Sequence, residues 1–283
     1  MPTELAAATA PRGIEKSQVP DGSLSAAFRG LPRLHLVERI AVRLPGAAAS
    51  GVTDMRTSEP SNADSGDPYA EEREAMVENQ IRKRGLKNER VLRAMTLVPR
   101  HEFVPPGSLP MAYADEPLGI GGGQTISQPY IVAAMTAALE LTGSERVLEI
   151  GAGCGYQAAV LALLAREVFS VEIRSDLAHS AAERLQRLGY HHVHVHCGDG
   201  SVGLKEFAPF DGIVVAAAAP AVPRPLLEQL ADGGRLIAPI GSDDHQQLIL
   251  ITRQGNQYWS ERRENCRFVP LIGRHGWKDG ELL

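Results

Sequence analysis

The sequence predicts an α/β protein in which a doubly wound, mostly parallel sheet carries helices on both faces and ends in an antiparallel strand pair. Three observations predict this class. Within residues 146–161 a short apolar run is followed by a glycine turn and an alanine-rich helical segment. Apolar strands and amphipathic helices then alternate up to Gly241, which is typical of parallel sheets. Two last segments, residues 247–252 and 259–269, are joined through a turn at Gly255-Asn256 and predict the antiparallel pair.

Length, charge and cysteine content narrow the class of protein further. The chain has 283 residues, of which 43% are hydrophobic, and a formal net charge of −5. This length suffices for one large α/β domain with an appendage. The negative charge argues against a nucleic-acid partner, which usually leaves a basic footprint. No run reaches the roughly 18 apolar residues of a membrane span. The three cysteines lack the spacing of a disulfide framework. We therefore expect a cytoplasmic monomer with no membrane partner.

The chain divides into an N-terminal extension and a folded domain. Residues 1–68 are rich in Ala, Pro, Gly and Ser, and we expect a mostly disordered segment because they hold few large apolar side chains. Apolar residues within 34–42 fit one short amphipathic element that docks on the domain or on a partner, and a transient helix fits them equally well. Met55 is an alternative start. The domain is expected to span residues 69–283.

Two helices are expected before the sheet. The first spans residues 69–84 as a charged helix with an apolar stripe, and Gly85 ends it. Asn88 offers an N-cap for the second helix, whose apolar residues recur at helical spacing. Residues 98–106 predict an extended connection that prolines interrupt. We expect the two helices to cover a site on the sheet.

The glycine turn predicts a ligand site at the end of its strand. Glycines at alternate positions, Gly151, Gly153 and Gly155, let the backbone turn sharply and let a ligand approach it. A dinucleotide-binding loop has the spacing G-x-G-x-x-G, whose third glycine would stand at Tyr156. The observed G-x-G-x-G, with Glu149 inside the preceding strand, resembles the first motif of S-adenosylmethionine-dependent methyltransferases. An ordinary strand-turn-helix joint without a ligand is the other interpretation.

Acidic residues at the ends of the next two strands strengthen the prediction of a ligand site. Glu172 lies 21 residues after Gly151, where a carboxylate accepts hydrogen bonds from ribose hydroxyls. Asp199 and Gly200 follow the strand predicted for residues 192–197. A carboxylate after a strand end points into the crevice of a doubly wound sheet. We expect these residues to bind the cofactor.

Three histidines, His192, His194 and His196, alternate along this strand. They invite a metal interpretation. Their spacing spreads them over roughly 13 Å of strand, too far for one ion to bind all three. The other interpretation is a solvated strand face, and we expect no metal.

A glycine-rich segment precedes a group of polar residues and a helix. Residues 119–123 are expected to form neither a stable strand nor a helix, and Pro129 begins an apolar helix. Between them stand four polar residues, Gln124, Thr125, Ser127 and Gln128. On this pattern alone two interpretations stay open: Ser127 or Gln128 caps the helix, or the hydroxyl groups lie at a binding site.

Residues 112–130 carry a family resemblance. Ala-Tyr-Ala-Asp at 112–115 and Gly-Gln-Thr-Ile-Ser-Gln-Pro-Tyr at 123–130 resemble the signature of protein-L-isoaspartate O-methyltransferases, as do residues 76–85 and 98–101. The resemblance covers about residues 69–283. It implies a Rossmann-like methyltransferase domain, in which residues 69–130 form the helical cover and the substrate-side loop and residues 146–283 form the cofactor-binding sheet and C-terminal strands. It also implies S-adenosylmethionine as methyl donor and damaged proteins or peptides as partners.

The resemblance assigns roles to individual residues. Ser127 is expected to be catalytic, as a hydrogen-bond donor that orients the substrate carboxylate. Its neighbours are expected to bind substrate: Thr125, Ile126 and Gln128. Asp199 is expected to contact the adenine amino group. The full set of expected cofactor-binding residues is Glu149, Gly151, Gly153, Gly155, Glu172, Asp199 and Gly200. Residues 269–273 with Trp277 resemble the segment that helps to close the site, whereas residues 216–219 lack the threonine that is more frequent in the family.

The expected reaction transfers a methyl group from S-adenosylmethionine to the free α-carboxylate of an L-isoaspartyl residue. An α-carboxyl group has a pKa of about 3.5, so the nucleophile is already ionised at neutral pH and needs no base. Three alternatives remain at this point: a methyltransferase of the same fold acting on a small molecule, a nicotinamide-dependent dehydrogenase, which Tyr156 disfavours, and a non-catalytic binding module.

Overall fold

The computed structural model describes residues 16–19, 67–242 and 245–278, the first range by its backbone alone. The amphipathic element predicted within residues 34–42 and nearly all of the predicted extension lie outside the described residues. In the part of the chain that is described, no helix combines the length and the hydropathy that crossing a bilayer requires.

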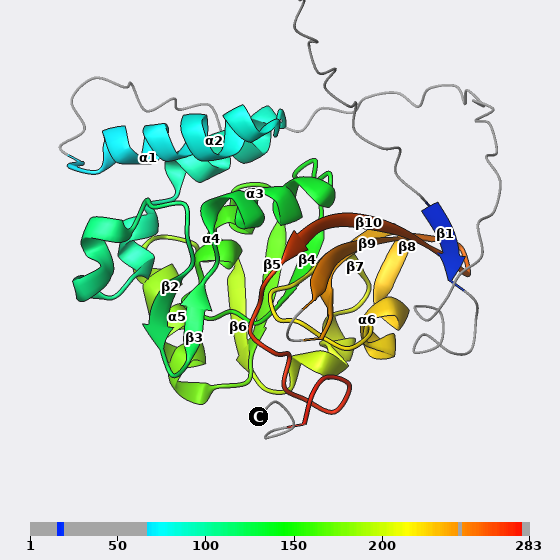
Figure 1. The fold of residues 1–283 in the computed structure, drawn as a ribbon. Coiled ribbons are helices and arrows are strands. Elements are labelled where there is room, and N and C mark those ends of the chain that lie inside the picture. Colours follow the sequence, from blue (N-terminus) through cyan, green and yellow to red (C-terminus); the bar gives the residue numbers. More distant parts are fainter. Residues whose placement is uncertain (1–15, 20–66, 243–244, 279–283) are drawn as a thin grey trace, which may run out of the picture.

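A single eight-stranded sheet forms the centre of the described residues (Figure 1). Its strand order is β1-β10-β9-β8-β7-β4-β5-β6. The neighbours from β8 to β6 pair in parallel, and β9 and β10 add to β8 antiparallel. This arrangement confirms the predicted fold class. The strands are Lys16–Val19 (β1), Arg146–Ile150 (β4), Glu167–Glu172 (β5), Val193–Cys197 (β6), Phe210–Val215 (β7), Leu230–Gly241 (β8), Gln246–Gln254 (β9) and Gln257–Cys266 (β10).

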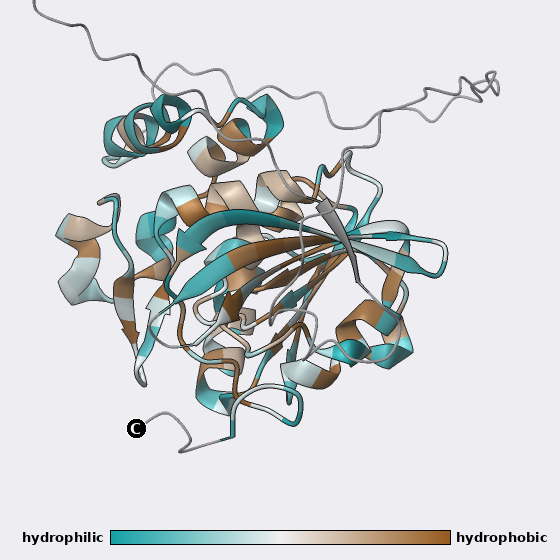
Figure 2. Ribbon diagram, turned by 45° about the vertical axis from the view of Figure 1, so that its right-hand side comes forward, coloured by the Kyte–Doolittle hydropathy of each residue, from teal (hydrophilic) through white to brown (hydrophobic). Residues whose placement is uncertain are grey.

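Helices pack on both faces of the sheet because successive side chains of a strand point to opposite faces. Val147 of β4 joins the apolar layer under α3 and α4, whereas Leu148 joins the layer under α6. The central strands are accordingly the most apolar part of the sheet (Figure 2). The helices are Ala70–Met76 (α1), Glu89–Leu97 (α2), Pro129–Ala138 (α3), Tyr156–Ala162 (α4), Ser175–Arg187 (α5) and Arg224–Glu228 (α6).

The two N-terminal helices form as expected, with one difference beyond them. A π-helical turn, Val77–Ile81, and a 3-10 turn extend α1 to Gly85, whose φ of 96° ends the helix. The Asn88 side chain accepts a hydrogen bond from the Val91 amide at 3.2 Å and caps α2. The connection predicted to be extended instead contains a 3-10 helix, Arg100–Phe103, and a second 3-10 helix, Pro106–Met111, begins at its last residue. These turns place Phe103 in the core, where it is buried.

The glycine-rich segment differs from the loop that we expected. Leu118–Gly121 (β2) pairs antiparallel with Gln124–Ile126 (β3) in a separate two-stranded sheet. Cross-strand pairing of Leu118 with Ile126, both buried, holds the hairpin against the low strand propensity of glycine. Gly122 and Gly123 have φ values of 57° and 72°, so the turn itself requires glycine.

Strand β1 is a second difference. Residues 16–19 pair antiparallel with Tyr258–Glu261 of β10, at one edge of the sheet (Figure 1). Composition did not reveal this strand, because pairing with an open sheet edge depends mainly on backbone groups.

Candidate active site

The topology of the sheet places a crevice at the carboxyl ends of its central strands. The chain passes from β4 to β5 and β6 on one side, while β7 and β8 lie on the other, so the strand order reverses beside β4. Ligands of open α/β sheets bind at such a switch point. A pocket of about 280 Å³ lies there, lined by the ends of β4, β5 and β7 and by Gly200 after β6.

The glycine turn forms one wall of this pocket. Gly151 and Gly153 line it with φ values of 90° and 53°. The amide of Gly151 donates to the Val171 carbonyl at 2.8 Å, which fixes the turn against β5. Gly155 does not line the pocket. A Cβ atom there would lie 3.1 Å from Cδ1 of Leu185, so this glycine permits α4 to pack closely on α5.

Glu172 holds the turn from the neighbouring strand. Its two carboxylate oxygens accept hydrogen bonds from the amides of Gly153, at 2.9 Å, and Arg174, at 3.0 Å. The side chain is buried and lines the pocket. The structure therefore places Glu172 where the sequence predicted a carboxylate for ribose hydroxyls, and it also gives this residue a part in shaping the glycine turn.

Glu149 is buried completely within the same wall. One of its oxygens accepts a hydrogen bond from the Ser170 hydroxyl. The pKa of Glu149 is raised to about 8, mainly by burial, with the hydrogen bond from Ser170 acting against the rise and the charge of Glu172 adding to it. At neutral pH this pocket-lining group therefore carries a proton.

Asp199 lies beside the pocket but is not part of its lining. Its oxygens accept hydrogen bonds from the amide and hydroxyl of Ser201, at 2.9 and 2.6 Å, and from the Arg274 amide, at 2.8 Å. Partial burial opposes the ionised form, but these bonds outweigh it and lower the pKa of Asp199. The expected contact with adenine stays a prediction. The next residue, Gly200, does line the pocket, and a Cβ there would meet Ile150 at 2.5 Å.

The polar residues before α3 form the opposite wall. Thr125, Ile126 and Ser127 line the pocket together with Gln124. No side chain caps α3 at its N-cap residue, Gln128, and the Ser127 hydroxyl makes no hydrogen bond to another described residue. The capping interpretation therefore does not account for these residues. Gln128 is absent from the lining, since its amide donates to the Asp115 carbonyl at 3.0 Å.

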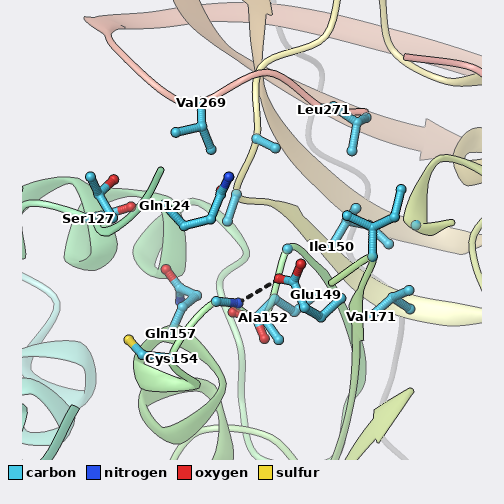
Figure 3. Close-up of a pocket in the computed structure, with 18 of the residues that line it drawn as sticks. Gln124, Ser127, Glu149, Ile150, Ala152, Cys154, Gln157, Val171, Val269 and Leu271 are labelled. Atoms are coloured by element: carbon cyan, nitrogen blue, oxygen red, sulfur yellow. Dashed lines mark hydrogen bonds between the residues drawn. The ribbon is translucent and has the colours of Figure 1, made fainter. Parts of the chain in front are cut away.

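A C-terminal segment closes the pocket. Residues 269–272 line it, and Figure 3 shows Val269 and Leu271 above the cavity, with Ser127 on one side and Val171 on the other. Ala218 anchors the segment, because its amide donates to the Val269 carbonyl at 2.8 Å and its carbonyl accepts from the Leu271 amide at 2.7 Å. In contrast, α1 and α2 contribute no residue to the lining, since α2 packs against α3 and α4 and α1 packs against α2. The cover of this pocket is thus C-terminal, rather than the N-terminal helices we expected.

Several lining residues were not predicted as site residues. They include Gln124, Tyr156, Gln157, Ile173 and Arg174. The Arg174 guanidinium also lies against the turn of the β2-β3 hairpin, where a Cβ on Gly122 would come within 2.8 Å of it. Most of these residues are sequence neighbours of predicted site residues, and this was the one signal by which they could have been predicted.

The histidines of β6 contact aromatic and backbone groups of neighbouring elements. His194 and His196 pack against Phe169, with ring centroids 5.1 and 6.3 Å apart, so the face is partly aromatic rather than simply solvated. His192 bonds the Ala162 carbonyl at 2.8 Å. Within the described ranges, no group of three or more His, Cys, Asp or Glu side chains is arranged to hold a metal ion.

The fold and this pocket define the chain as a class I methyltransferase that uses S-adenosylmethionine. A cavity with a glycine turn and two buried carboxyl groups, one of which has an oxygen without a hydrogen-bond partner among the described residues, suits a ligand with hydroxyl groups and positive charge. The sequence model of the family described as protein-L-isoaspartate(D-aspartate) O-methyltransferase matches residues 71–276. The chain belongs to this family.

Relatives and solved structures agree with this assignment. The chain is 54% identical over 212 residues to protein-L-isoaspartate O-methyltransferase 2 of Shewanella sediminis, covering 75% of this chain and 86% of the relative. It is 51% identical over 214 residues to the protein-L-isoaspartate O-methyltransferase of Syntrophus aciditrophicus, covering 75% of this chain and 98% of the relative. A solved protein-L-isoaspartate O-methyltransferase superposes with a TM-score of 0.66 at 32% identity, over 72% of this chain and 67% of that one. A Plasmodium falciparum structure described as the same enzyme in complex with S-adenosyl-L-homocysteine has a TM-score of 0.61 at 27% identity, over 71% and 98% of the two chains.

Proposed function

We propose that the protein transfers the methyl group of S-adenosylmethionine to the free α-carboxylate of L-isoaspartyl residues in damaged proteins and peptides. The observation that carries this proposal beyond the family match is the position of Ser127. Its hydroxyl lines the same pocket as Gly151, Gly153 and Glu172 and has no hydrogen-bond partner among the described residues. A hydroxyl group in this position can donate to a substrate carboxylate.

The chemistry asks little of the protein beyond positioning. The substrate carboxylate has an ordinary pKa of about 3.5, so no residue has to remove a proton from it. S-Adenosylmethionine supplies, when bound, a methyl group activated by a positively charged sulfur. The chain must then align the carboxylate with that methyl group and exclude water, and the apolar segment 269–272 is placed to exclude it.

A neutral donor suits this reaction better than a cation. The carboxylate charge disperses in the transition state, so a strong ionic contact would stabilise the ground state more than the transition state. We assign this donor to Ser127, with Thr125 and Ile126 as further substrate-binding residues. Gln128 supports them through its bond to the 115 carbonyl. The methyl ester then closes to a succinimide without the enzyme, which begins the repair that the family resemblance implies.

We assign the cofactor side to the ends of the central strands. Glu172 is the proposed ribose ligand, Asp199 the proposed adenine contact, and Glu149 a further acidic residue of the wall. Gly151, Gly153 and Gly200 leave room for the cofactor, and Gly155 supports the turn by letting α4 pack on α5.

The proposal extends to partners and location. We propose a monomer of the cytoplasm that acts on proteins and peptides and on neither nucleic acid nor membranes. The net charge of −5 supports the absence of a nucleic-acid partner. Cys154, Cys197 and Cys266 are free thiols, which agrees with a reducing compartment.

A methyl-transfer assay on paired peptides tests the proposed function. The two peptides differ only in an aspartyl or isoaspartyl linkage, and labelled S-adenosylmethionine is the donor. We expect label in the isoaspartyl peptide alone. Transfer to a small molecule but to neither peptide would favour the alternative methyltransferase, and cofactor binding without any transfer would favour a binding module.

A further inference from the structure

One carboxyl oxygen of Glu149 has no hydrogen-bond partner among the described residues. The side chain is 0% exposed and lines the pocket at the end of β4. One carboxylate oxygen accepts from Ser170 of β5, whereas Oε1 is buried and has no partner among the described residues. Buried polar atoms are nearly always hydrogen-bonded in native proteins. An unpartnered oxygen in the wall of a binding pocket therefore points to an interaction with what the pocket binds.

Among the described residues, no cation forms an ion pair with Glu149. From β5 it faces the neutral Ser170 and the negatively charged Glu172, and from β7 it pairs in register with Val214. From the glycine turn and α4, Glu149 faces the Cys154 thiol, the phenol of Tyr156 and the amide of Gln157. Burial raises the pKa of the thiol and of the phenol, so both are uncharged.

The remaining sides of the pocket add one cation at its border. The β3 wall presents the uncharged side chains of Gln124, Thr125 and Ser127, and the C-terminal segment 269–272 is apolar. Arg174 also lines the pocket, but its guanidinium lies 3.7 Å from Asp176. Burial and the charge of Glu172 accordingly raise the pKa of Glu149, with the Ser170 bond acting against them.

We infer that Glu149 distinguishes the charged methyl donor from the neutral product by moving one proton. It holds a proton in the free protein, releases the proton to solvent when the sulfonium cofactor binds, and takes a proton back when the thioether product remains. This inference rests on the methyl donor of the proposed function. S-Adenosylmethionine carries one more positive charge than S-adenosylhomocysteine, so only the former brings a net cation into a pocket that has two acidic side chains. The ionised carboxylate then attracts the donor and not the product.

A definite pH dependence of affinity follows from this exchange. Because binding releases a proton, a rise in pH favours binding of S-adenosylmethionine as long as free Glu149 is protonated. We expect the affinity to rise about tenfold per pH unit between roughly pH 6 and 8 and to level off above that range. The affinity for S-adenosylhomocysteine is expected to change much less, so the protonated acid assists product release.

Titration calorimetry of the full chain at about pH 6 tests the inference. At this pH the α-amino groups of both ligands, with ordinary pKa values near 8, are already charged and exchange few protons. Repeating each titration in two buffers with different ionisation enthalpies counts the protons released. We expect about one proton for S-adenosylmethionine with the wild-type chain, and close to none for S-adenosylhomocysteine.

Two variants separate Glu149 from other causes. Glu149→Gln keeps the shape of the protonated acid and should abolish the proton release, weaken S-adenosylmethionine binding about tenfold or more at pH 8 and change product binding little. Ser170→Ala keeps the acid but removes the donor that favours its ionised form, so the pH at which affinity levels off should rise. If Glu149→Gln does not fold, the inference is tested by the proton release of the wild-type chain with each of the two ligands and by the shifted pH dependence of Ser170→Ala.

Equal proton release for both ligands, release that persists in Glu149→Gln, or none for either ligand would overturn the inference. These outcomes leave methyl transfer untouched, because they concern binding alone. If S-adenosylmethionine bound at no pH, the proposed function would fail instead.

Discussion

Ser127 is a neutral hydroxyl in the wall of a pocket whose other wall is built from glycines and carboxyl groups. We expect Ser127→Ala to lower turnover roughly 100-fold, as loss of one well-placed donor does in other enzymes, while the affinity for S-adenosylmethionine stays within about twofold. Steady-state kinetics with an isoaspartyl peptide and calorimetry with the cofactor measure the two effects. Ser144→Ala is the matched control, since Ser144 lies in an exposed turn outside the pocket. Unchanged turnover with lost cofactor affinity would reverse the assignment.

Glu172 and Asp199 each act as single residues on the cofactor side, but through different contacts. Glu172→Ala removes an acceptor for two backbone amides of the wall, so cofactor affinity should fall about tenfold or more. Asp199→Ala should weaken cofactor binding too, because Asp199 accepts a hydrogen bond from the Arg274 amide, just beyond the closing segment 269–272. Calorimetry gives both affinities, and the fluorescence of Trp277, which donates to the Ala218 carbonyl at 3.0 Å, reports whether that segment has moved. An unchanged affinity in either variant would remove that residue from the cofactor side.

Among the secondary-structure elements, the joint between β4 and α4 depends on the packing of Gly155, and Gly189, which follows α5, provides a comparison. Gly155 has a φ of 90°, and a Cβ atom there would lie 3.1 Å from Leu185, whereas Gly189, with a φ of 86°, has open space around it. Gly189→Ala should therefore lower the free energy of unfolding through backbone strain alone. Gly155→Ala should lower it more, because a packing cost is added to the strain, with a total loss of about 1–3 kcal/mol. Urea unfolding of the two variants measures the difference. Equal losses would contradict the packing role of Gly155.

The elements also show which parts of the fold could be predicted. Strands β4 and β7 are apolar runs that end at small residues, so pattern and structure coincide there. The β2-β3 hairpin was missed because its glycines suppress the strand signal, whereas the cross-strand pairing of Leu118 with Ile126 becomes visible only in the folded chain. Strand β1 was missed because its partner lies more than 200 residues away in sequence.

The same distinction holds for the site. Residues at the ends of β4 and β5, and Gly200 after β6, line one pocket, since parallel strands bring their carboxyl ends to one edge of the sheet, whereas their binding of the cofactor stays a prediction. Gln157 and Arg174 were missed, because only tertiary packing turns them toward the cavity. Asp199 carries the predicted carboxylate, but its bonds to the closing segment appear only in the folded chain.

For the whole molecule, the titration of Glu149 predicts how stability depends on pH. Its pKa in the folded protein is about 8, raised by burial from an ordinary 4.5. The fold favours the protonated acid, so this contribution is fully present below about pH 4.5 and is lost as pH rises through about 8. Asp199 acts in the opposite sense, because its lowered pKa stabilises the fold above the ordinary value and this contribution is lost in acid.

We therefore expect the melting temperature of the wild-type chain, without ligand, to fall by a few degrees between about pH 5 and 8. Glu149→Gln should flatten this decline, since it has no proton to lose. Differential scanning calorimetry across this range provides the measurement. A decline of the same size in the variant would show that other groups cause it.

The pairing of β1 with β10 has a consequence for shortened forms of the chain. The segment that supplies β1 lies ahead of the family match, which begins at residue 71. Removing residues 1–66 would return the amides and carbonyls of Tyr258–Glu261 to solvent. Strands with such unpaired backbone groups pair with strands of other molecules. A trimmed enzyme would keep every pocket residue and yet self-associate in concentrated solution, which light scattering against the full chain would detect.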